Sequence, residues 1–174
     1  DRDTSVALWD TGCKETGKIL VVSSYWDIKY SAFPPKVIEA VDYAQRNHYE
    51  LYIGMDSNAH SPLWGSPKSN PRGHTVENIL PTLGLTVLNV GNVPTYVEND
   101  KATHIDITLT TIKLSTYVND WHVSQDYSHS DHRVICSTLQ SVITDKRCKQ
   151  TTRKTKWKEF TKLMSERCKS TPHI

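Results

Sequence analysis

The most informative polar residues of the chain follow an apolar run near its middle. The sequence predicts a strand over residues 50–55 (ELYIGM), and Asp56 and Asn58 come directly after it. Because alternate residues of an extended chain point to the same side, both side chains can reach one site. A carboxylate there can hold a Mg²⁺-bound water or orient a nucleophile, and an amide can donate to a phosphoryl oxygen. An Asx turn at the end of a strand gives the same pattern, so this motif alone leaves both interpretations open.

A second acid lies within a strand that the sequence predicts over residues 103–110. Ile105, Ile107 and Leu109 alternate there with Asp106 and two threonines. A carboxylate on a strand face is costly unless it is paired. A histidine suits this pairing, because the carboxylate fixes the tautomer of the ring and stabilises the imidazolium. The alternative is an edge strand on which Asp106 faces water.

Two histidines and an acid, His129, Asp131 and His132, precede a strand predicted over residues 133–139. They could bind zinc, with His60 as a further candidate, but the segment lacks the ligand spacing that zinc sites show. Taken alone, a solvated polar loop is the simpler interpretation. The four cysteines contain no C-x-x-C pair, which argues against a zinc ribbon or a dithiol redox site.

Tyr25 could bind an anion, and Arg72 and Trp64 have simpler roles beside the core. Tyr25 ends a strand predicted over residues 18–24, where its hydroxyl can donate to an anion or its ring can pack at the rim. Arg72 closes a polar loop over residues 56–72 that also contains Trp64. The indole can simply cover the core, and the guanidinium can cap it through an ion pair.

These residues depend on elements that alternate between strands and helices along the chain. Hydrophobic periodicity predicts helices over residues 35–48 and 73–83, with a proline in the first turn of one and in the last turn of the other. A further helix is predicted over residues 156–167. Strands are predicted over residues 5–9, 18–24, 50–55, 86–89, 94–97, 103–110, 121–123 and 133–139. This alternation favours an α/β or α+β sandwich.

The composition is that of a globular chain without a membrane span. Of 174 residues, 37% are apolar and 23% charged, and no run approaches the ~20 apolar residues of a membrane helix. The net charge of +2 divides into −5 for residues 1–143 (11 Lys and Arg, 16 Asp and Glu) and +7 for residues 144–174 (10 against 3). We therefore predict an acidic domain over residues 1–143 and a basic linker over residues 144–174. Since the chain begins with Asp1 and its only methionines are Met55 and Met164, we expect a fragment shortened at its N-terminus.

The motifs follow one another in a distinctive order. They are Tyr25, G-M-D-S-N-A-H (54–60), L-W-G-S (63–66), R-G (72–73), G-L (84–85), L-N (88–89), P-T-Y (94–96), I-D-I-T-L (105–109) and S-D-H-R (130–133). Over residues 5–140 this order resembles the endonuclease/exonuclease/phosphatase superfamily. The W-G-S, R-G and P-T-Y elements are similar to the apurinic-type endonuclease domains of jockey and LINE-like non-LTR retrotransposons. The resemblance implies a partial four-layer α/β sandwich of the DNase I-like type.

The resemblance also implies a phosphodiesterase that uses Mg²⁺ (or Mn²⁺) and nicks DNA to leave a 3′-hydroxyl that primes reverse transcription. In that scheme Asp56 orients or deprotonates the attacking water, and Asn58 helps to hold the phosphate. Asp106 orients His132, which contacts the scissile phosphate. Tyr25 donates to a phosphate or leaving oxygen. The identity of the general base stays open.

Other site residues and the partners follow from the same resemblance. Asp131 is expected near the metal or the leaving group, and Thr103, Arg72 and Ser130 are expected to bind substrate. The implied partners are DNA and, in the parent polyprotein, the element RNA and the reverse transcriptase, toward which residues 144–174 lead. An intracellular location is expected, nuclear when genomic DNA is the substrate, with no membrane partner.

The chain departs from the family pattern in two ways, and the second of them weakens the expected activity. Met55 separates the glycine from the acid of the usual G-D-x-N, which marks a sub-branch. The family also places an Asn and a metal-binding Glu on earlier strands, and Asp10 and Glu15 stand in the wrong context to replace them. We therefore expect a weak or inactive nuclease. The alternative is a retroelement remnant that at most binds nucleic acid through its basic tail; an inositol-phosphate or sphingomyelin phosphodiesterase is disfavoured by the R-G and W-G-S elements.

Overall fold

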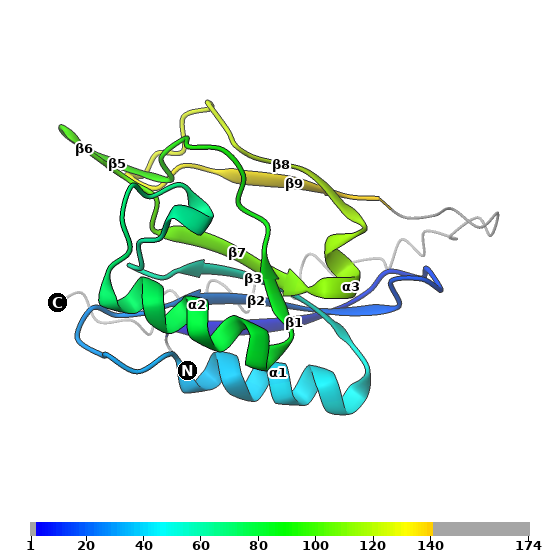
Figure 1. Cartoon of the computed structure of the whole chain (residues 1–174). Coiled ribbons are helices and arrows are strands. Elements are labelled where there is room, and N and C mark those ends of the chain that lie inside the picture. Colours follow the sequence, from blue (N-terminus) through cyan, green and yellow to red (C-terminus); the bar gives the residue numbers. More distant parts are fainter. Residues whose placement is uncertain (1–2, 141–174) are drawn as a thin grey trace, which may run out of the picture. The chain divides into compact units, whose positions relative to one another are not determined.

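A mixed five-stranded sheet forms the centre of the protein (Figure 1). The structure is a computed structural model in which residues 3–140 are described. The strand order is β1-β2-β3-β7-β4, with bounds Thr4–Asp10 (β1), Lys18–Tyr25 (β2), Glu50–Asp56 (β3), Asp106–Thr111 (β7) and Leu85–Val87 (β4). β2 and β3 run parallel, and the other neighbouring strands run antiparallel. The α/β class predicted from the sequence is confirmed.

Two helices, α1 (Pro35–Asn47) and α2 (Pro71–Leu83), cover one face of this sheet (Figure 1). α1 buries the apolar stripe that its periodicity predicts, and Pro35 fits its first turn. α2 begins two residues before the predicted start, because the Asn70 side chain caps it by accepting from the Gly73 N–H at 2.7 Å. The helices and the sheet share one apolar core, which includes Val22, Val37, Val41, Ile53, Val76, Ile107 and Leu109.

A second, two-stranded sheet lies over the other face. It pairs β8 (Val118–Val123) with β9 (Ile135–Leu139), and α3 (Ile112–Ser115) leads into it from β7. The Trp121 indole N–H donates to the Thr108 hydroxyl at 2.9 Å, and the hydroxyls of Tyr52 and Ser137 lie 2.8 Å apart. Helices, central sheet and second sheet are thus three layers of the predicted sandwich.

The strand predicted over residues 103–110 is present as β7 from Asp106 onward, but its predicted start is wrong, because Thr103 belongs to a separate strand. β6 (Lys101–Thr103) forms a hairpin with β5 (Tyr96–Glu98), and this hairpin projects at one end of the molecule (Figure 1). β7 begins only at Asp106. Between them, the Ile105 carbonyl accepts from both the N–H and the hydroxyl of Ser57 (2.9 and 2.7 Å). These tertiary bonds remove Ile105 from a continuous ladder.

β1 is one of the two edge strands of the central sheet, and its residues Val6, Leu8 and Trp9 are about half exposed. No helix within residues 3–140 is long and apolar enough to cross a membrane.

Two further predictions lie outside the described residues. They are the basic linker over residues 144–174 and the helix over residues 156–167.

Candidate active site

Two carboxylates face each other where β3 ends and β7 begins. Asp56 is the last residue of β3 and Asp106 the first of β7, and antiparallel pairing makes them direct partners across the two strands. Directly opposed residues of an antiparallel pair have Cβ atoms ~5 Å apart. The sheet therefore fixes two acids side by side. Their carboxylates repel each other unless a cation or a proton lies between them.

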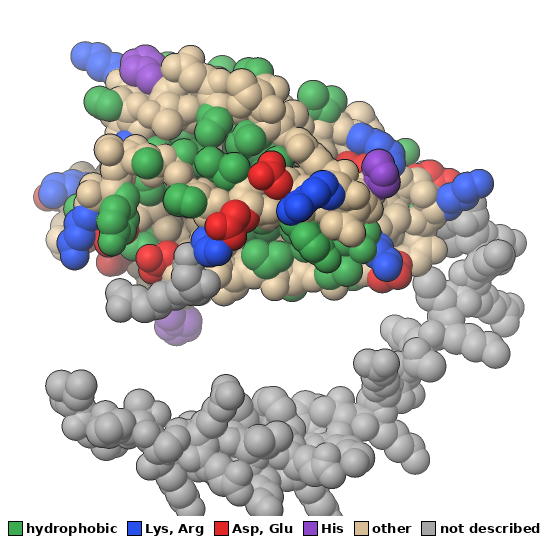
Figure 2. Space-filling model, turned by 90° about the horizontal axis from the view of Figure 1, so that it is seen from below, with side chains coloured by type: hydrophobic (Ala, Val, Ile, Leu, Met, Phe, Trp, Pro, Cys, Tyr) green, Lys and Arg blue, Asp and Glu red, His purple; other side chains and the backbone are tan. Residues whose placement is uncertain are grey.

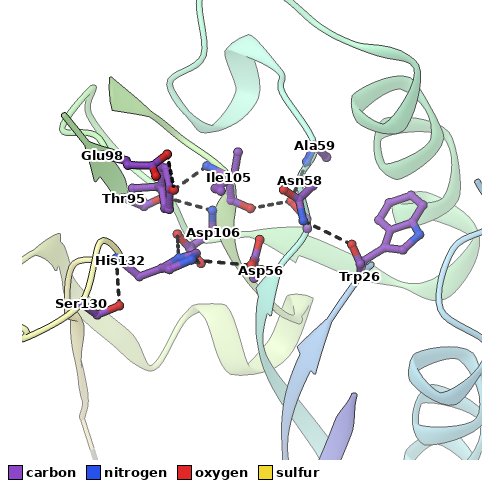
Figure 3. Close-up of polar contacts among 12 residues, drawn as sticks. Trp26, Asp56, Asn58, Ala59, Thr95, Glu98, Ile105, Asp106, Ser130 and His132 are labelled. Atoms are coloured by element: carbon purple, nitrogen blue, oxygen red, sulfur yellow. Dashed lines mark hydrogen bonds and ion pairs between the residues drawn. The ribbon is translucent and has the colours of Figure 1, made fainter. Parts of the chain in front are cut away.

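His132 reaches both acids from the loop between β8 and β9 (Figure 3). Its Nδ1 lies 3.0 Å from each carboxylate oxygen of Asp106. Its Nε2 lies 3.7 Å from Oδ2 of Asp56. The carboxylate of Asp106 thus fixes the orientation of the ring and favours a proton on Nδ1, while Nε2 is left toward Asp56 and the open side of the site.

Backbone bonds to the neighbouring hairpin hold His132 in place. The Val97 N–H donates to the Asp131 carbonyl at 2.8 Å, and the Arg133 N–H donates to the Thr95 carbonyl at 2.7 Å. The Tyr96 ring meets the imidazole edge-on, with ring centroids 4.9 Å apart. The histidine loop is therefore attached, on both sides of His132, to β5 and to the residue that precedes it.

The carboxylate of Asp56 is electrostatically strained. Burial raises its pKa above the usual aspartate range and Asp106 raises it further, whereas His132, a hydrogen bond from the Asn58 N–H and the charge of Arg72 oppose this shift. Its Oδ1 is buried and has no hydrogen-bond partner among the described residues. A buried carboxylate oxygen without a donor favours a proton or a cation.

The three side chains also fit a metal ion. One ligand atom each from Asp56, Asp106 and His132 lie within 4.8 Å of one another, the single such group of His, Cys, Asp and Glu side chains in residues 3–140. The orphaned Oδ1 of Asp56 is the oxygen ligand that a hard divalent cation prefers. Asp131, the acid predicted to bind metal, is exposed and lies outside this group.

Tyr25 adds a phenol to the same cavity. It is the register partner of Asp56 across the parallel pair β2 and β3, and 41% of it is exposed. A cavity of about 640 Å³ is lined by Tyr25, Asp56, Asp106 and His132, together with backbone and side chains of β2, β3 and β7. Burial raises the pKa of Tyr25, and Asp27, Asp56 and Asp3 raise it further, so the phenol keeps its proton and stays a donor.

The other predicted site residues lie outside the lining of this cavity. Asn58 has a left-handed backbone (φ 50°), and its amide donates to the Trp26 carbonyl at 3.3 Å. Thr103 ends β6. The Ser130 hydroxyl accepts from the His132 N–H at 3.2 Å. Arg72 donates to backbone carbonyls around Trp26 and Ser57.

Sequence reasoning assigned no role to two buried residues that support Asp106. The Thr95 hydroxyl accepts from the N–H groups of Ile105 and Asp106 at 3.2 and 3.0 Å. The Asn89 amide donates to the Asp106 carbonyl and accepts from the Thr108 N–H. Both residues belong to motifs of the sequence, P-T-Y and L-N. The signal that could have indicated their role is a polar residue next to an apolar strand.

The sequence and the structure of the chain were compared with those of known proteins. Residues 19–136 match the endonuclease-reverse transcriptase family. The endonuclease domain of TRAS1, a telomere-specific non-LTR retrotransposon, is 27% identical, with a TM-score of 0.66 over 80% of this chain and 62% of that domain. The chain therefore spans about three fifths of the TRAS1 domain. No curated protein matches the chain.

More distant structures share the fold. The 3′-5′ exonuclease NExo from Neisseria meningitidis is 16% identical, with a TM-score of 0.53 over 79% of this chain and 71% of that one. The AP endonuclease LMAP from Leishmania major is 11% identical, with a TM-score of 0.57 over 79% of this chain and 54% of that one. The match over residues 19–136 and the likeness to the TRAS1 domain together establish that the chain belongs to the endonuclease-reverse transcriptase family.

Proposed function

We propose that the chain is the metal-dependent endonuclease domain of a non-LTR retrotransposon, which nicks target DNA by hydrolysing a phosphodiester. The observation that carries this proposal is the row Asp56–His132–Asp106 at the strand ends, within a chain of this family. The nick leaves a 3′-hydroxyl that primes reverse transcription. The substrate is therefore DNA, with the element RNA and the reverse transcriptase as partners in the parent polyprotein and the nucleus as the place of action.

In this scheme water attacks the phosphorus, and the P–O3′ bond breaks as the O3′ leaving group takes a proton. Asp56 orients the water and accepts its proton, which suits a carboxylate whose pKa is raised by burial. His132 donates from Nε2 to a phosphate oxygen, and the carboxylate of Asp106 stabilises the imidazolium that this requires. Tyr25, which lines the same cavity, donates to a phosphate or leaving oxygen.

Of the group Asp56, Asp106 and His132, the two carboxylates would hold a divalent cation, for which we propose Mg²⁺ or Mn²⁺, because His132 as a protonated donor has no free nitrogen lone pair. When bound, the cation supplies Lewis-acid stabilisation of the negative charge that develops on the phosphate. Asp131, Asn58, Thr103 and Ser130 remain proposed contacts to the metal or the substrate, as the family resemblance implies. The weak activity predicted from the sequence also stays a prediction.

Conversion of supercoiled plasmid to the nicked form tests this function. Because the activity is expected to be low, the assay uses the protein in excess over plasmid, with Mg²⁺, Mn²⁺ or EDTA. We expect metal-dependent nicking that His132→Ala abolishes, and nicks that a DNA polymerase extends from a free 3′-hydroxyl. The control is His74→Ala, since His74 is an exposed histidine on α2 that pairs with Glu77.

Two other outcomes would contradict the proposal. Nicking that persists in His132→Ala would point to a contaminating nuclease. Binding of DNA without nicking under any metal condition would favour the alternative, an inactive remnant that binds nucleic acid through residues 144–174. On the face shown in Figure 2, Lys and Arg are interspersed with Asp and Glu. That face of the described residues therefore has no strongly basic surface that could bind nucleic acid.

A further inference from the structure

The R-G motif at the start of α2 joins the two loops that leave the catalytic ends of β2 and β3. Arg72 projects from the first turn of α2 and donates to four carbonyls. Nη1 donates to Asp27 and Tyr30 at 3.3 and 2.8 Å, and Nη2 donates to Trp26 at 2.6 Å. Nε donates to Ser57 at 3.1 Å. One side chain thus binds the loop after Tyr25 and the loop after Asp56 at once.

These bonds use most of the donors of the guanidinium. An arginine has five N–H groups, and four of them are directed at backbone oxygens here. One face of the guanidinium is also covered, since its Cζ lies 3.7 Å from the centroid of the Trp26 ring. Recognition of a phosphate by an arginine fork needs two parallel N–H groups. Arg72 has one left, so it is poorly suited to bind the DNA backbone.

The rest of the α2 N-terminus holds the second loop in the same way. The side-chain carbonyl oxygen of Asn70 accepts from the His60 N–H at 3.0 Å, and its amide donates to the Asn58 carbonyl at 3.2 Å. The helix approaches this loop so closely that a methyl group on Gly73 would overlap the His60 carbonyl. Asn58 needs this support, because its own backbone is left-handed.

The positions fixed by Arg72 adjoin two of the proposed catalytic residues. Tyr25 and Asp56 are register partners, and the Trp26 N–H donates to the Asp56 carbonyl at 2.9 Å. Arg72 binds the carbonyls of the next residues along both strands, Trp26 and Ser57. Loss of the guanidinium would remove the donor to the Ser57 carbonyl and would leave the Trp26 carbonyl with the longer bond from the Asn58 amide at 3.3 Å, so both strand ends could shift.

We infer that Arg72 is a positioning residue that fastens the exits of β2 and β3 to each other, and that it is not a ligand of the DNA phosphate. The kinetic part of this inference rests on the proposed nuclease function, whereas the fastening of the two loops does not. A shift of about 1 Å at a catalytic group can lower a rate by roughly a hundredfold. We therefore expect loss of Arg72 to slow the chemical step and to leave DNA affinity unchanged.

Two measurements on Arg72→Ala and Arg72→Lys test the inference. The first is single-turnover nicking over a range of protein and salt concentrations. A positioning residue predicts a rate at saturation lower by about a hundredfold, with an unchanged half-saturating concentration and salt dependence. Added guanidinium ion should restore part of the rate of Arg72→Ala. A phosphate ligand predicts the opposite pattern: weaker binding and a slope of log K against log salt smaller by about 0.9, a result that would overturn the inference.

The second measurement is hydrogen exchange of the whole chain, which needs no activity. Arg72→Ala should raise exchange in peptides covering residues 26–30 and 57–60 together, and guanidinium ion should lower it again. The matched control is Arg46→Ala, because Arg46 donates to a single carbonyl on the exposed side of α1. Unchanged exchange in both loops would overturn the inference even if the chain proves to be a nuclease. Faster exchange in a chain without nuclease activity would refute only the proposed function. If Arg72→Ala fails to fold, Arg72→Lys, which keeps the charge but lacks the fork, carries both measurements.

Discussion

The two sides of the candidate site are held by different kinds of bond. On the side of α2, side chains fix the loops: Asn70 and Arg72 make the bonds, and Gly73 allows the close approach. On the side of β9, backbone bonds between residues 131–133 and residues 95–97 hold the loop that carries His132. A scaffold made of side chains can be broken by one substitution, whereas one made of backbone bonds tolerates most substitutions. We therefore expect substitutions on the α2 side to lower the stability of the protein, and substitutions on the β9 side to lower mainly the rate of the reaction.

The largest effect is expected from Asp106→Asn on the β9 side. An amide can bond to Nδ1 of His132 but cannot stabilise the imidazolium, and it can bind the wrong tautomer. We expect the nicking rate to fall by about a thousandfold, with a change in melting temperature of only a few degrees. The measurement is single-turnover nicking together with thermal unfolding. A rate within tenfold of the parent chain would show that Asp106 does not act through His132.

The second effect concerns stability on the α2 side. A Cβ on Gly73 would overlap a backbone oxygen of the neighbouring loop, which cannot move away without breaking the Asn70 bonds. We expect Gly73→Ala to lower the free energy of unfolding by about 3 kcal/mol, as overpacked sites do. Denaturant unfolding measures this change. The control is Gly54→Ala on β3, where a Cβ would meet no atom within 4 Å; equal losses in the two variants would remove the contrast between the two sides.

Thr95→Val tests a place where the β9 side also depends on a side chain. The substitution keeps the shape of Thr95 but removes the acceptor of the Ile105 and Asp106 N–H groups. Leaving buried donors unpaired costs about 2 kcal/mol, and the start of β7 should move with Asp106. Thr95→Ser keeps the hydroxyl and serves as control. If Val and Ser variants unfold at the same denaturant concentration, these bonds contribute little.

Local patterns in the sequence predicted most of the elements. Pro35 and the stripe Val37, Val41 and Ala44 define α1, and alternating or β-branched runs define β2, β3 and β7. These signals are local, since they depend on periodicity and on proline geometry. The break between β6 and β7 could not be predicted in this way. It depends on Ser57 and Thr95, which bond to Ile105 from 48 and 10 positions away along the chain.

The site, like the fold, has parts that the sequence predicts and parts that it does not. Sequence reasoning expected a histidine beside the acid on the strand, and His132 lies 3.0 Å from Asp106. The family resemblance implies that Arg72 binds substrate, and the sequence gives no sign of the four backbone carbonyls to which its guanidinium donates. Asp131 is adjacent to His132 in sequence, yet it is exposed while His132 is turned toward the acids. Neighbouring residues of an extended segment point to opposite sides, and the sequence alone did not reveal which side faces the site.

The smallest expected effect lies where the two sides meet, at Asp56. Burial, reinforced by Asp106, raises the pKa of this carboxyl above the usual aspartate range, so its ionisation opposes folding. The stability that the protonated form contributes is present below the usual pKa and is lost as the pH rises through the raised value. An amide at this position carries no charge, so Asp56→Asn should raise the free energy of unfolding at pH 8 by about 1 kcal/mol.

This gain should shrink as the pH falls toward the raised pKa, because the parent carboxyl then takes up its proton. Melting temperatures of both chains at pH 8, 6.5 and 5, in EDTA, measure the trend. Nicking should be lost at every pH, so stability and activity would change in opposite directions at one residue. A lower melting temperature of the variant at pH 8 would mean that the attraction between Asp56 and His132, whose Nε2 lies 3.7 Å away, outweighs the cost of burial. Asp56 would then belong to the scaffold as well as to the chemistry.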